Sequence, residues 1–300
     1  MANQVAHGII AAMVTPLDEA SRVNETELRQ QVDRQIKAGV NGIFTLGTNG
    51  EGYILSHAEK LQVLKIVVDE AKHRVPIYAG TGCVSTAETI QLSQEAEKIG
   101  ADALSIVTPS FAKASQEELY RHYKAINDAV HLPILLYNIP ARTGNALSPE
   151  TVSRLADLKQ IIGVKDSSGN FDNILQYIEL TRDRGFDVIS GNDALILWTL
   201  QAGGTGGITA VANVLPKIMV SIYQKWLAGD FKGAQAAQDS IRPLRNCFKL
   251  GNPNTIIKRA TSIIGYPVGQ TRAPFNYLSP EADKQLEDVL RDQYSQYFVK

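Results

Sequence analysis

The sequence is poor in cysteine, since Cys83 and Cys247 are the only two in 300 residues. They lie far apart and form no paired motif, which argues against a disulfide framework and indicates a reduced compartment. The first apolar run, residues 8–14, follows no basic segment and is too short for a signal peptide. No later run is long enough to cross a bilayer. These absences predict a cytoplasmic protein.

The chain also carries almost no net charge, because its 30 basic and 31 acidic residues give a formal charge of −1. A chain without a strong positive field is not expected to hold nucleic acid. The five histidines are scattered without metal-ligand spacing, so we expect no bound metal. The G-x-S-x-G motif of a serine nucleophile is missing as well.

What the sequence does contain is the composition of a globular chain, 44% hydrophobic and 20% charged, which excludes disorder and a collagen-like structure. Short apolar or β-branched runs recur about every 25–30 residues, each followed by a longer stretch at helical period. Eight such runs occur, and eight parallel strands close a barrel. They occupy residues 8–14, 42–46, 75–79, 103–107, 134–137, 161–164, 187–190 and 206–210.

We therefore predict an α/β fold, a (β/α)8 TIM barrel. An open doubly wound sheet is the alternative, but the segment 15–18 after the first run, Thr-Pro-Leu-Asp, lacks the dinucleotide fingerprint of such sheets. Helix starts agree with the barrel, because four polar residues are each followed three positions later by a glutamate, the spacing of an N-cap. These predicted N-caps are Asn24, Ser56, Ser85 and Ser115.

Roughly 85 residues follow the eighth run, which is more than a barrel needs for its last helix. Their pattern predicts helices over 214–228, 231–248, 253–264 and 279–293. We expect a catalytic barrel over residues 1–228 and a C-terminal helical subdomain, an extension of the barrel, over residues 229–300.

In such barrels the active site lies at the C-terminal ends of the strands, so polar residues after each run are the candidates. Lys165 follows the sixth run, where burial would favour a neutral amine that can form a Schiff base with a ketone. The alternative is a lysine that extends out of the barrel to a surface carboxylate. The neighbouring Asp166 is then either the partner of Lys165 or a helix N-cap.

Two further candidates lie at the ends of neighbouring runs. Tyr137 closes the fifth run, one strand from Lys165, where a phenol can shuttle protons; a half-buried aromatic side chain is the alternative. Thr48 and Asn49 follow Gly47 in a glycine-flanked loop. Converging backbone N–H groups in such a loop suit a small carboxylate, although any tight turn before a helix has a similar pattern.

Five segments, in order and spacing, make the whole chain resemble the dihydrodipicolinate synthase/N-acetylneuraminate lyase superfamily of pyruvate-dependent class I aldolases. They are Gly47-Thr48-Asn49-Gly50-Glu51, Tyr137-Asn138-Ile139-Pro140, Gly163-Val164-Lys165-Asp166, Gly203-Gly204-Thr205-Gly206-Gly207-Ile208 and Asn252-Pro253. The resemblance implies a lyase that uses a covalent lysine imine and neither a metal nor another cofactor. It also implies a homotetramer, built as a dimer of dimers, that acts on pyruvate and an aldehyde.

The resemblance further implies roles for the candidate residues. Lys165 forms the imine with pyruvate, Tyr137 relays protons, and Thr48 links Tyr137 to the reacting centre. The residues implied in substrate binding are Gly47, Asn49, Phe111, Arg142, Gly191, Asn192, Gly206, Gly207 and Ile208.

The segment Pro140–Gly144 resembles the dihydrodipicolinate synthase subgroup, in which an arginine at the position of Arg142 receives the carboxylate of L-aspartate 4-semialdehyde. Sialic-acid lyases resemble the chain less, since they carry an acidic residue where Ala194 stands here. The resulting expectation is condensation of pyruvate with the semialdehyde, a step of lysine biosynthesis.

Two departures leave alternatives open. Phe111 replaces a tyrosine that reaches into the neighbouring subunit's site in synthases, and Asn49 replaces a threonine. The alternatives are an aldolase or dehydratase of 2-keto-3-deoxy sugar acids and, from another class, a non-catalytic keto-acid-binding relative. Val84 and Ser110 replace an asparagine and a tyrosine of the lysine-inhibitor site, although Glu88 remains, so we predict no feedback by lysine.

Overall fold

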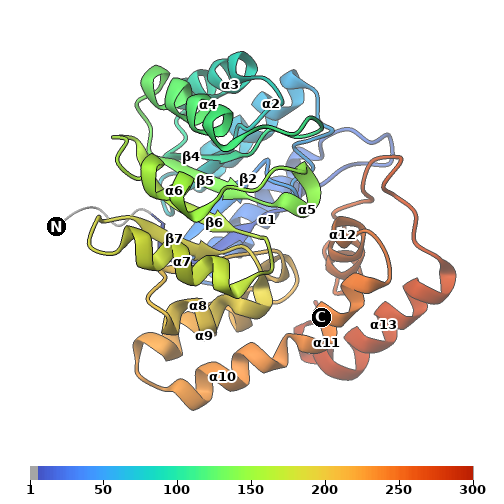
Figure 1. Ribbon diagram of the computed structural model, residues 1–300. Helices are drawn as coiled ribbons and strands as arrows, with labels where there is room; N and C mark the ends of the chain where they lie inside the picture. The colour runs from blue at the N-terminus through green and yellow to red at the C-terminus, as the bar shows by residue number, and fades with distance from the viewer. Residues whose placement is uncertain (1–5, 300) are drawn as a thin grey trace.

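The computed structural model describes residues 6–299, within which eight parallel strands form a closed barrel in chain order (Figure 1). Strand β8 pairs with β1 and completes the ring. The predicted TIM barrel is confirmed, and every predicted run overlaps a strand. The strands are β1 Gly8–Ala12, β2 Gly42–Thr45, β3 Ile77–Gly80, β4 Ala103–Val107, β5 Ile134–Asn138, β6 Ile161–Asp166, β7 Asp187–Ser190 and β8 Gly206–Thr209.

Helices alternate with the strands and surround the barrel (Figure 1). All four predicted N-caps are confirmed, since each side-chain oxygen accepts a hydrogen bond from the backbone N–H of the glutamate three residues later. The α-helices of the barrel are α1 Glu25–Lys37, α2 His57–Ala71, α3 Thr86–Ile99, α4 Gln116–Ala129, α5 Pro140–Thr143, α6 Pro149–Leu155, α7 Phe171–Thr181, α8 Ile196–Gln201 and α9 Pro216–Leu227. Short 3₁₀ turns follow β7 at η1 Asp193–Leu195 and β8 at η2 Val211–Asn213.

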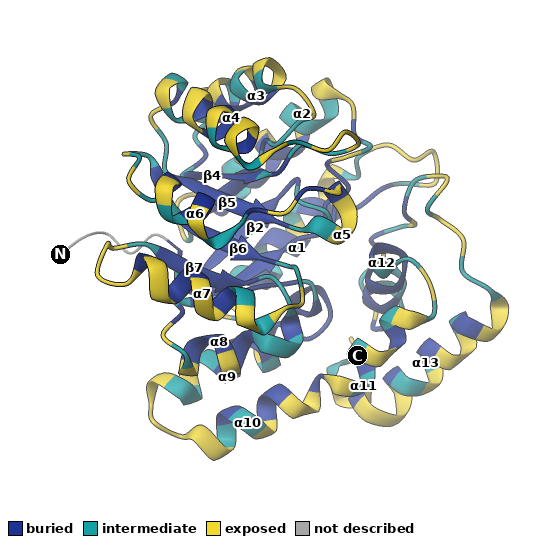
Figure 2. Ribbon diagram, in the orientation of Figure 1, coloured by how far each residue is buried: buried dark blue, intermediate teal, exposed yellow. Residues whose placement is uncertain are grey.

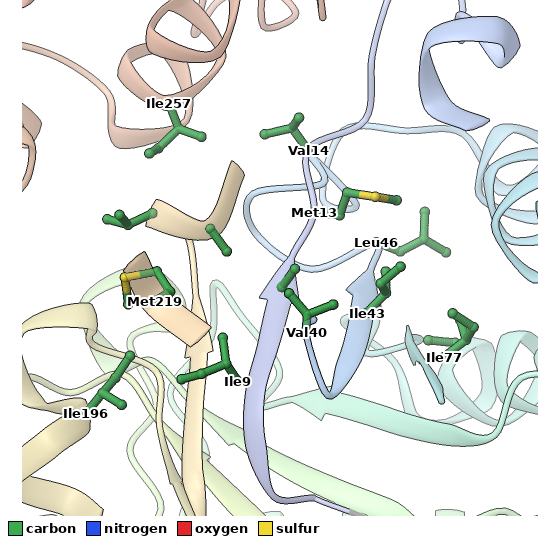
Figure 3. Packing of buried hydrophobic residues seen from close by; sticks show 14 of the residues in the cluster. Ile9, Met13, Val14, Val40, Ile43, Leu46, Ile77, Ile196, Met219 and Ile257 are labelled. Atoms are coloured by element: carbon green, nitrogen blue, oxygen red, sulfur yellow. The ribbon is translucent and has the colours of Figure 1, made fainter. Parts of the chain in front are cut away.

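Two apolar layers result from the alternation of side chains along each strand. Ile10 of β1 belongs to the cluster inside the barrel, whereas its neighbour Ile9 packs outward between the strands and the helices. Figure 3 places Ile9 beside Ile196 of α8 and Met219 of α9. The strands are buried almost throughout, and the outer faces of the helices are exposed (Figure 2).

After the barrel the chain continues through α10 Phe231–Ser240, α11 Arg242–Asn246, η3 Cys247–Lys249, α12 Pro253–Ile263, α13 Pro280–Tyr294 and η4 Ser295–Tyr297 (Figure 1). The predicted single helix over 231–248 is wrong. It breaks at Ile241, because Pro243 in the first turn of α11 has no N–H with which to continue the helical hydrogen bonds. The division into two domains at residue 228 stays a prediction, and its outer ends, residues 1–5 and 300, lie outside the described residues. None of the helices within 6–299 combines the length and the apolar character needed to cross a membrane.

Candidate active site

Lys165 lies inside the mouth of the barrel, next to Tyr137. The two residues are direct partners in the register of β5 and β6. Because Val164 packs outward against the helices, its neighbour Lys165 points inward. The lysine is only 4% exposed, and its Nζ lies 3.8 Å from the centroid of the Tyr137 ring and 4.9 Å from that of Phe44. The alternative of a lysine that reaches a surface carboxylate is therefore wrong.

Asp166 is not the partner of Lys165. Alternation along β6 turns the carboxylate away from the lysine, and it accepts hydrogen bonds from Asn138 Nδ2 at 2.8 Å and Asn173 Nδ2 at 2.7 Å. The N-cap of α7 is Asn170. Both roles predicted for Asp166 are therefore wrong, and within residues 6–299 no carboxylate pairs with the Lys165 amine.

Gly191 leaves the room that the Lys165 side chain occupies. A Cβ atom at this position would lie 2.7 Å from Lys165 Cε, closer than carbon atoms pack. The same atom would lie 2.0 Å from Ser167 Oγ. Gly191 thus allows the chain just after β7 to pass close to the Lys165 side chain without displacing it.

The hydroxyl of Tyr137 meets the loop that follows β2. Tyr137 Oη lies 3.1 Å from Thr48 Oγ1, and either atom can donate the hydrogen bond. The Tyr137 ring packs edge to face on Phe44, with ring centroids 6.1 Å apart. The structure thus joins an amine, a phenol and an alcohol at the mouth of the barrel, a set that can carry out proton transfer around an imine.

Residues of the C-terminal helices, which the sequence did not single out, hold this loop. Asn254 Nδ2 donates to the carbonyl oxygen of Thr48 at 2.6 Å. Lys258 Nζ donates to Glu51 Oε1 at 2.7 Å, and both side chains are 1% exposed. Burial lowers the pKa of Lys258, and the Glu51 carboxylate opposes that shift. The sequence signals for these contacts are Glu51 in the segment 47–51 and the Asn252-Pro253 motif at the start of α12.

A cavity of about 250 Å³ collects most of the predicted residues. Eight of them line it: Thr48, Asn49, Tyr137, Arg142, Lys165, Gly191, Asn192 and Ile208. The cavity is also lined by Asp193, Arg245, Phe248 and Asn254, which sequence reasoning missed, since three of these come from the segment after the barrel. Among residues 6–299, no group of three or more His, Cys, Asp or Glu side chains is placed to hold a metal ion.

Four predicted residues do not line this cavity. Gly47 lies under the Phe44 ring, where a Cβ atom would come within 2.5 Å of the ring. Gly206 and Gly207 are buried within β8 behind Ile208. Phe111 is 99% exposed and lies outside the site of its own chain.

A second, larger cavity of about 760 Å³ adjoins the first and shares Thr48 and Arg142 with it. Val84, Glu88 and Ser110, the positions that bear on lysine inhibition, line this second cavity. The two cavities thus meet at Thr48, in the loop after β2, and at Arg142 of α5.

Comparisons with known proteins agree over nearly the whole chain. The Dihydrodipicolinate synthetase family matches residues 5–293. A 4-hydroxy-tetrahydrodipicolinate synthase of Methanopyrus kandleri is 42% identical over 287 residues, 95% of this chain and 94% of that protein. The crystal structure of a chloride-inhibited dihydrodipicolinate synthase from Acinetobacter baumannii in complex with pyruvate matches with a TM-score of 0.92 and 36% identity, covering 96% of this chain and 98% of that one. A monomeric dihydrodipicolinate synthase variant matches with a TM-score of 0.93 and 32% identity, covering 96% and 97%.

Proposed function

The chain belongs to the dihydrodipicolinate synthetase family, and from this we propose that it is a lyase that condenses pyruvate with L-aspartate 4-semialdehyde, a 4-hydroxy-tetrahydrodipicolinate synthase. The observation that carries the proposal is the Lys165 amine. It is buried at the mouth of the barrel, beside the Tyr137 ring, and forms no ion pair with any residue from 6 to 299. An amine in such a place is suited to attack a keto acid.

The proposed reaction begins when the Lys165 amine attacks the C2 carbonyl of pyruvate and water leaves to give an imine. Loss of a proton from the pyruvate methyl group gives an enamine, whose carbon attacks the aldehyde carbon of the second substrate. The aldehyde oxygen takes up a proton and becomes a hydroxyl. Attack on the imine carbon, by the amino group of the bound product or by water, then releases the lysine.

Tyr137 and Thr48 are the proposed proton carriers. Their hydroxyls lie within hydrogen-bonding distance, so a proton accepted at Tyr137 Oη can pass to Thr48 Oγ1 and back. Phe111 has no hydroxyl to extend this relay from a neighbouring subunit. In this proposal the relay therefore ends at Thr48.

We assign the two carboxylates to opposite sides of the cavity. Asn49 and the backbone of the loop after β2 hold the carboxylate of pyruvate, with Ile208 on the facing wall. Arg142 lines the same cavity, is exposed, and forms no ion pair with the described residues, so its guanidinium is free to bind the carboxylate of the semialdehyde.

Borohydride trapping tests the imine. With pyruvate and sodium borohydride we expect a stable adduct on Lys165, located by peptide mass spectrometry. Lys258 is an internal control, because it is equally buried but paired with Glu51. Absence of an adduct on Lys165 would instead favour the non-catalytic keto-acid-binding protein.

A second candidate is an aldolase or dehydratase of 2-keto-3-deoxy sugar acids, favoured by Asn49 and Phe111. Pyruvate consumption with L-aspartate 4-semialdehyde, compared with glyceraldehyde at matched concentration, distinguishes the two. Faster turnover of the semialdehyde, reduced at least about tenfold in Arg142→Ala, supports the synthase. Turnover confined to the other aldehyde supports the second candidate.

We further propose a cytoplasmic homotetramer that lysine does not inhibit. Phe111, 99% exposed at a φ of +81°, presents an apolar ring that a neighbouring subunit would cover. Light scattering measures the oligomeric state, and a monomer would overturn the proposed tetramer.

Val84 and Ser110 lack the groups that bind lysine in inhibited enzymes, so millimolar lysine is expected to leave the rate unchanged.

A further inference from the structure

Arg245 brings a second guanidinium to the catalytic cavity. It belongs to α11, the short helix after α10, yet it lines the same cavity of about 250 Å³ as Lys165 and Arg142. Its guanidinium lies above the Phe248 ring, 4.7 Å from the centroid, and its side chain is 26% exposed. The side chain therefore rests against an apolar wall at the edge of the substrate space.

The contacts of Arg245 leave most of its hydrogen-bond donors unused. Nη2 donates to Asn192 Oδ1 at 3.0 Å, and this is its one side-chain hydrogen bond within residues 6–299. Asp193 Oδ2 lies 3.6 Å from Nη1, so the two groups form an ion pair without a short hydrogen bond. The Nε atom is buried without a partner among the described residues. A guanidinium has five N–H donors, so Arg245 is only partly satisfied by the protein.

Asp193 carries the opposing charge of this ion pair, and its other oxygen is engaged by the backbone. Asp193 Oδ1 accepts hydrogen bonds from the backbone N–H groups of Ala210 at 3.1 Å and Val211 at 3.5 Å. These bonds fasten the carboxylate to the turn after β8. Asp193 is thus held mainly by the backbone, 3.6 Å from the guanidinium that it faces.

The charges that line the cavity do not balance. Its three basic side chains are Lys165, Arg142 and Arg245, and its single acidic one is Asp193. Pyruvate brings one negative charge. L-Aspartate 4-semialdehyde adds none, since its ammonium offsets its carboxylate, whereas an aldehyde with an uncompensated anionic group would match the remaining positive charge.

We propose that Arg245 is a specificity-determining residue that binds a terminal oxyanion, a carboxylate or a phosphate, on a second class of acceptor aldehyde. The inference rests on the imine chemistry proposed for Lys165. The enamine carbon forms a bond to the aldehyde carbon, the aldehyde oxygen takes up a proton, and water hydrolyses the imine. The product is a 4-hydroxy-2-oxo acid with the oxyanion at its far end.

The test compares anionic aldehydes with neutral ones of similar length in the full-length protein. Succinic semialdehyde is paired with butanal, and D-glyceraldehyde 3-phosphate with D-glyceraldehyde, with pyruvate consumption as the readout. We expect kcat/KM to be at least about tenfold higher for the anionic member of one or both pairs. The pair that responds identifies the oxyanion, and no preference in either pair overturns the proposal.

Variants separate recognition from folding. In Arg245→Gln the ratio of anionic to neutral kcat/KM is expected to fall about tenfold or more, and Arg245→Lys is expected to restore part of it. The matched control is Arg242→Gln in the same helix, because Arg242 is 69% exposed and paired with Asp239. An equal loss for neutral and anionic aldehydes in Arg245→Gln would indicate a structural role and overturn the proposal.

Failure of this inference can be distinguished from failure of the proposed function. Borohydride trapping with pyruvate involves no acceptor aldehyde, so the adduct on Lys165 is expected in wild type and in Arg245→Gln alike. If the adduct forms and the ratio is unaffected by Arg245→Gln, the Arg245 proposal alone is wrong. If no adduct forms in wild type, the lysine chemistry itself is wrong.

Discussion

Two lysines are buried among residues 6–299, and their surroundings differ in kind. Lys165, at the end of β6, faces the rings of Tyr137 and Phe44 and has no carboxylate partner among residues 6–299. Lys258, in α12, donates to Glu51 Oε1 at 2.7 Å and to the carbonyl oxygen of Gln270 at 2.9 Å. Burial alone therefore does not define the role of a lysine in this protein.

The difference lies in what happens to the positive charge. The positive charge of Lys258 is paired with the buried Glu51 carboxylate, and this ion pair holds α12 against the loop after β2. Lys165 has no such anion, so its amine remains available to a keto acid. One lysine thus fixes the loop after β2, and the other is the amine that we propose forms the imine beside it.

The largest expected effect comes from removing the Lys165 amine, the proposed nucleophile. In Lys165→Met we expect kcat/KM to fall by at least about 10³-fold and the borohydride adduct to disappear. Stability should change by no more than about 1–2 kcal/mol, because no buried carboxylate loses its partner. Pyruvate consumption, adduct mass and urea unfolding measure the three quantities. An adduct that persists on another lysine would contradict the assignment of the imine to Lys165.

Lys258→Met, in contrast, should lower the stability of the fold strongly. It leaves Glu51 charged and buried without its partner, which is expected to cost about 3–5 kcal/mol of unfolding free energy. Adding Glu51→Gln removes that charge and should recover much of the loss. Urea unfolding provides the measurement, with Lys284→Met, an exposed lysine paired with Asp288, as the control that leaves the midpoint unchanged. Equal destabilisation by both single variants would contradict the difference in burial.

Tyr137→Phe separates the role of the Tyr137 hydroxyl from that of its ring, because it keeps the ring beside the Lys165 amine and removes only the hydroxyl. We expect kcat to fall about 10²-fold through loss of the proton carrier, while the adduct with pyruvate still forms, more slowly. Thr48→Val is expected to lose less, about tenfold, since it removes the second member of the relay. Unchanged turnover in Tyr137→Phe would show that the ring alone matters.

The smallest effect on stability is expected at the partly exposed pair of Arg272 and Glu59, which adjoins the buried pair of Lys258 and Glu51. Arg272 donates its backbone N–H to Glu51, and its guanidinium, through hydrogen bonds, lowers the pKa of Glu59 to about 2. Because this pKa lies below the ordinary value of 4.5, the pair stabilises the fold above that pH and the contribution is lost as the pH falls towards 2. Partial exposure limits it to about 1 kcal/mol or less.

Glu59→Gln should therefore lower the urea midpoint slightly at pH 7 and flatten its decline between pH 5 and pH 2. The same decline in the variant and the wild type would assign the acid sensitivity to other carboxylates.

Much of the fold could be predicted from local patterns. Recurring short apolar runs located all eight strands, and the spacing of Ser56 and Ser115 to a later glutamate located helix starts, because both signals depend on neighbours within a few residues. The end of the long predicted helix at 231–248 was missed, although Pro243 was visible in the sequence. A proline so near a helix start can be tolerated, so only the structure shows that the helix breaks before it.

Some residues of the candidate site could also be predicted from local position, and others only from the structure. Position after a strand pointed to Lys165 and Tyr137, and the register of β5 and β6 brings them together. Position alone also suggested Asp166 as a partner, but alternation turns its carboxylate away from the lysine. Arg245 carried no signal, because nothing in the local sequence of α11 says which cavity that helix faces.

By itself the sequence determined the barrel and the identity of the buried amine at its mouth, since short apolar runs and stretches at helical period are local features of the chain. The tertiary structure alone decided which charges meet. Lys258 and Glu51 are 207 residues apart, as Asn254 and Thr48 are 206 apart. Contacts of this range depend on how the C-terminal helices pack across the barrel mouth, and that packing is the sum of many side-chain contacts rather than of any one pattern.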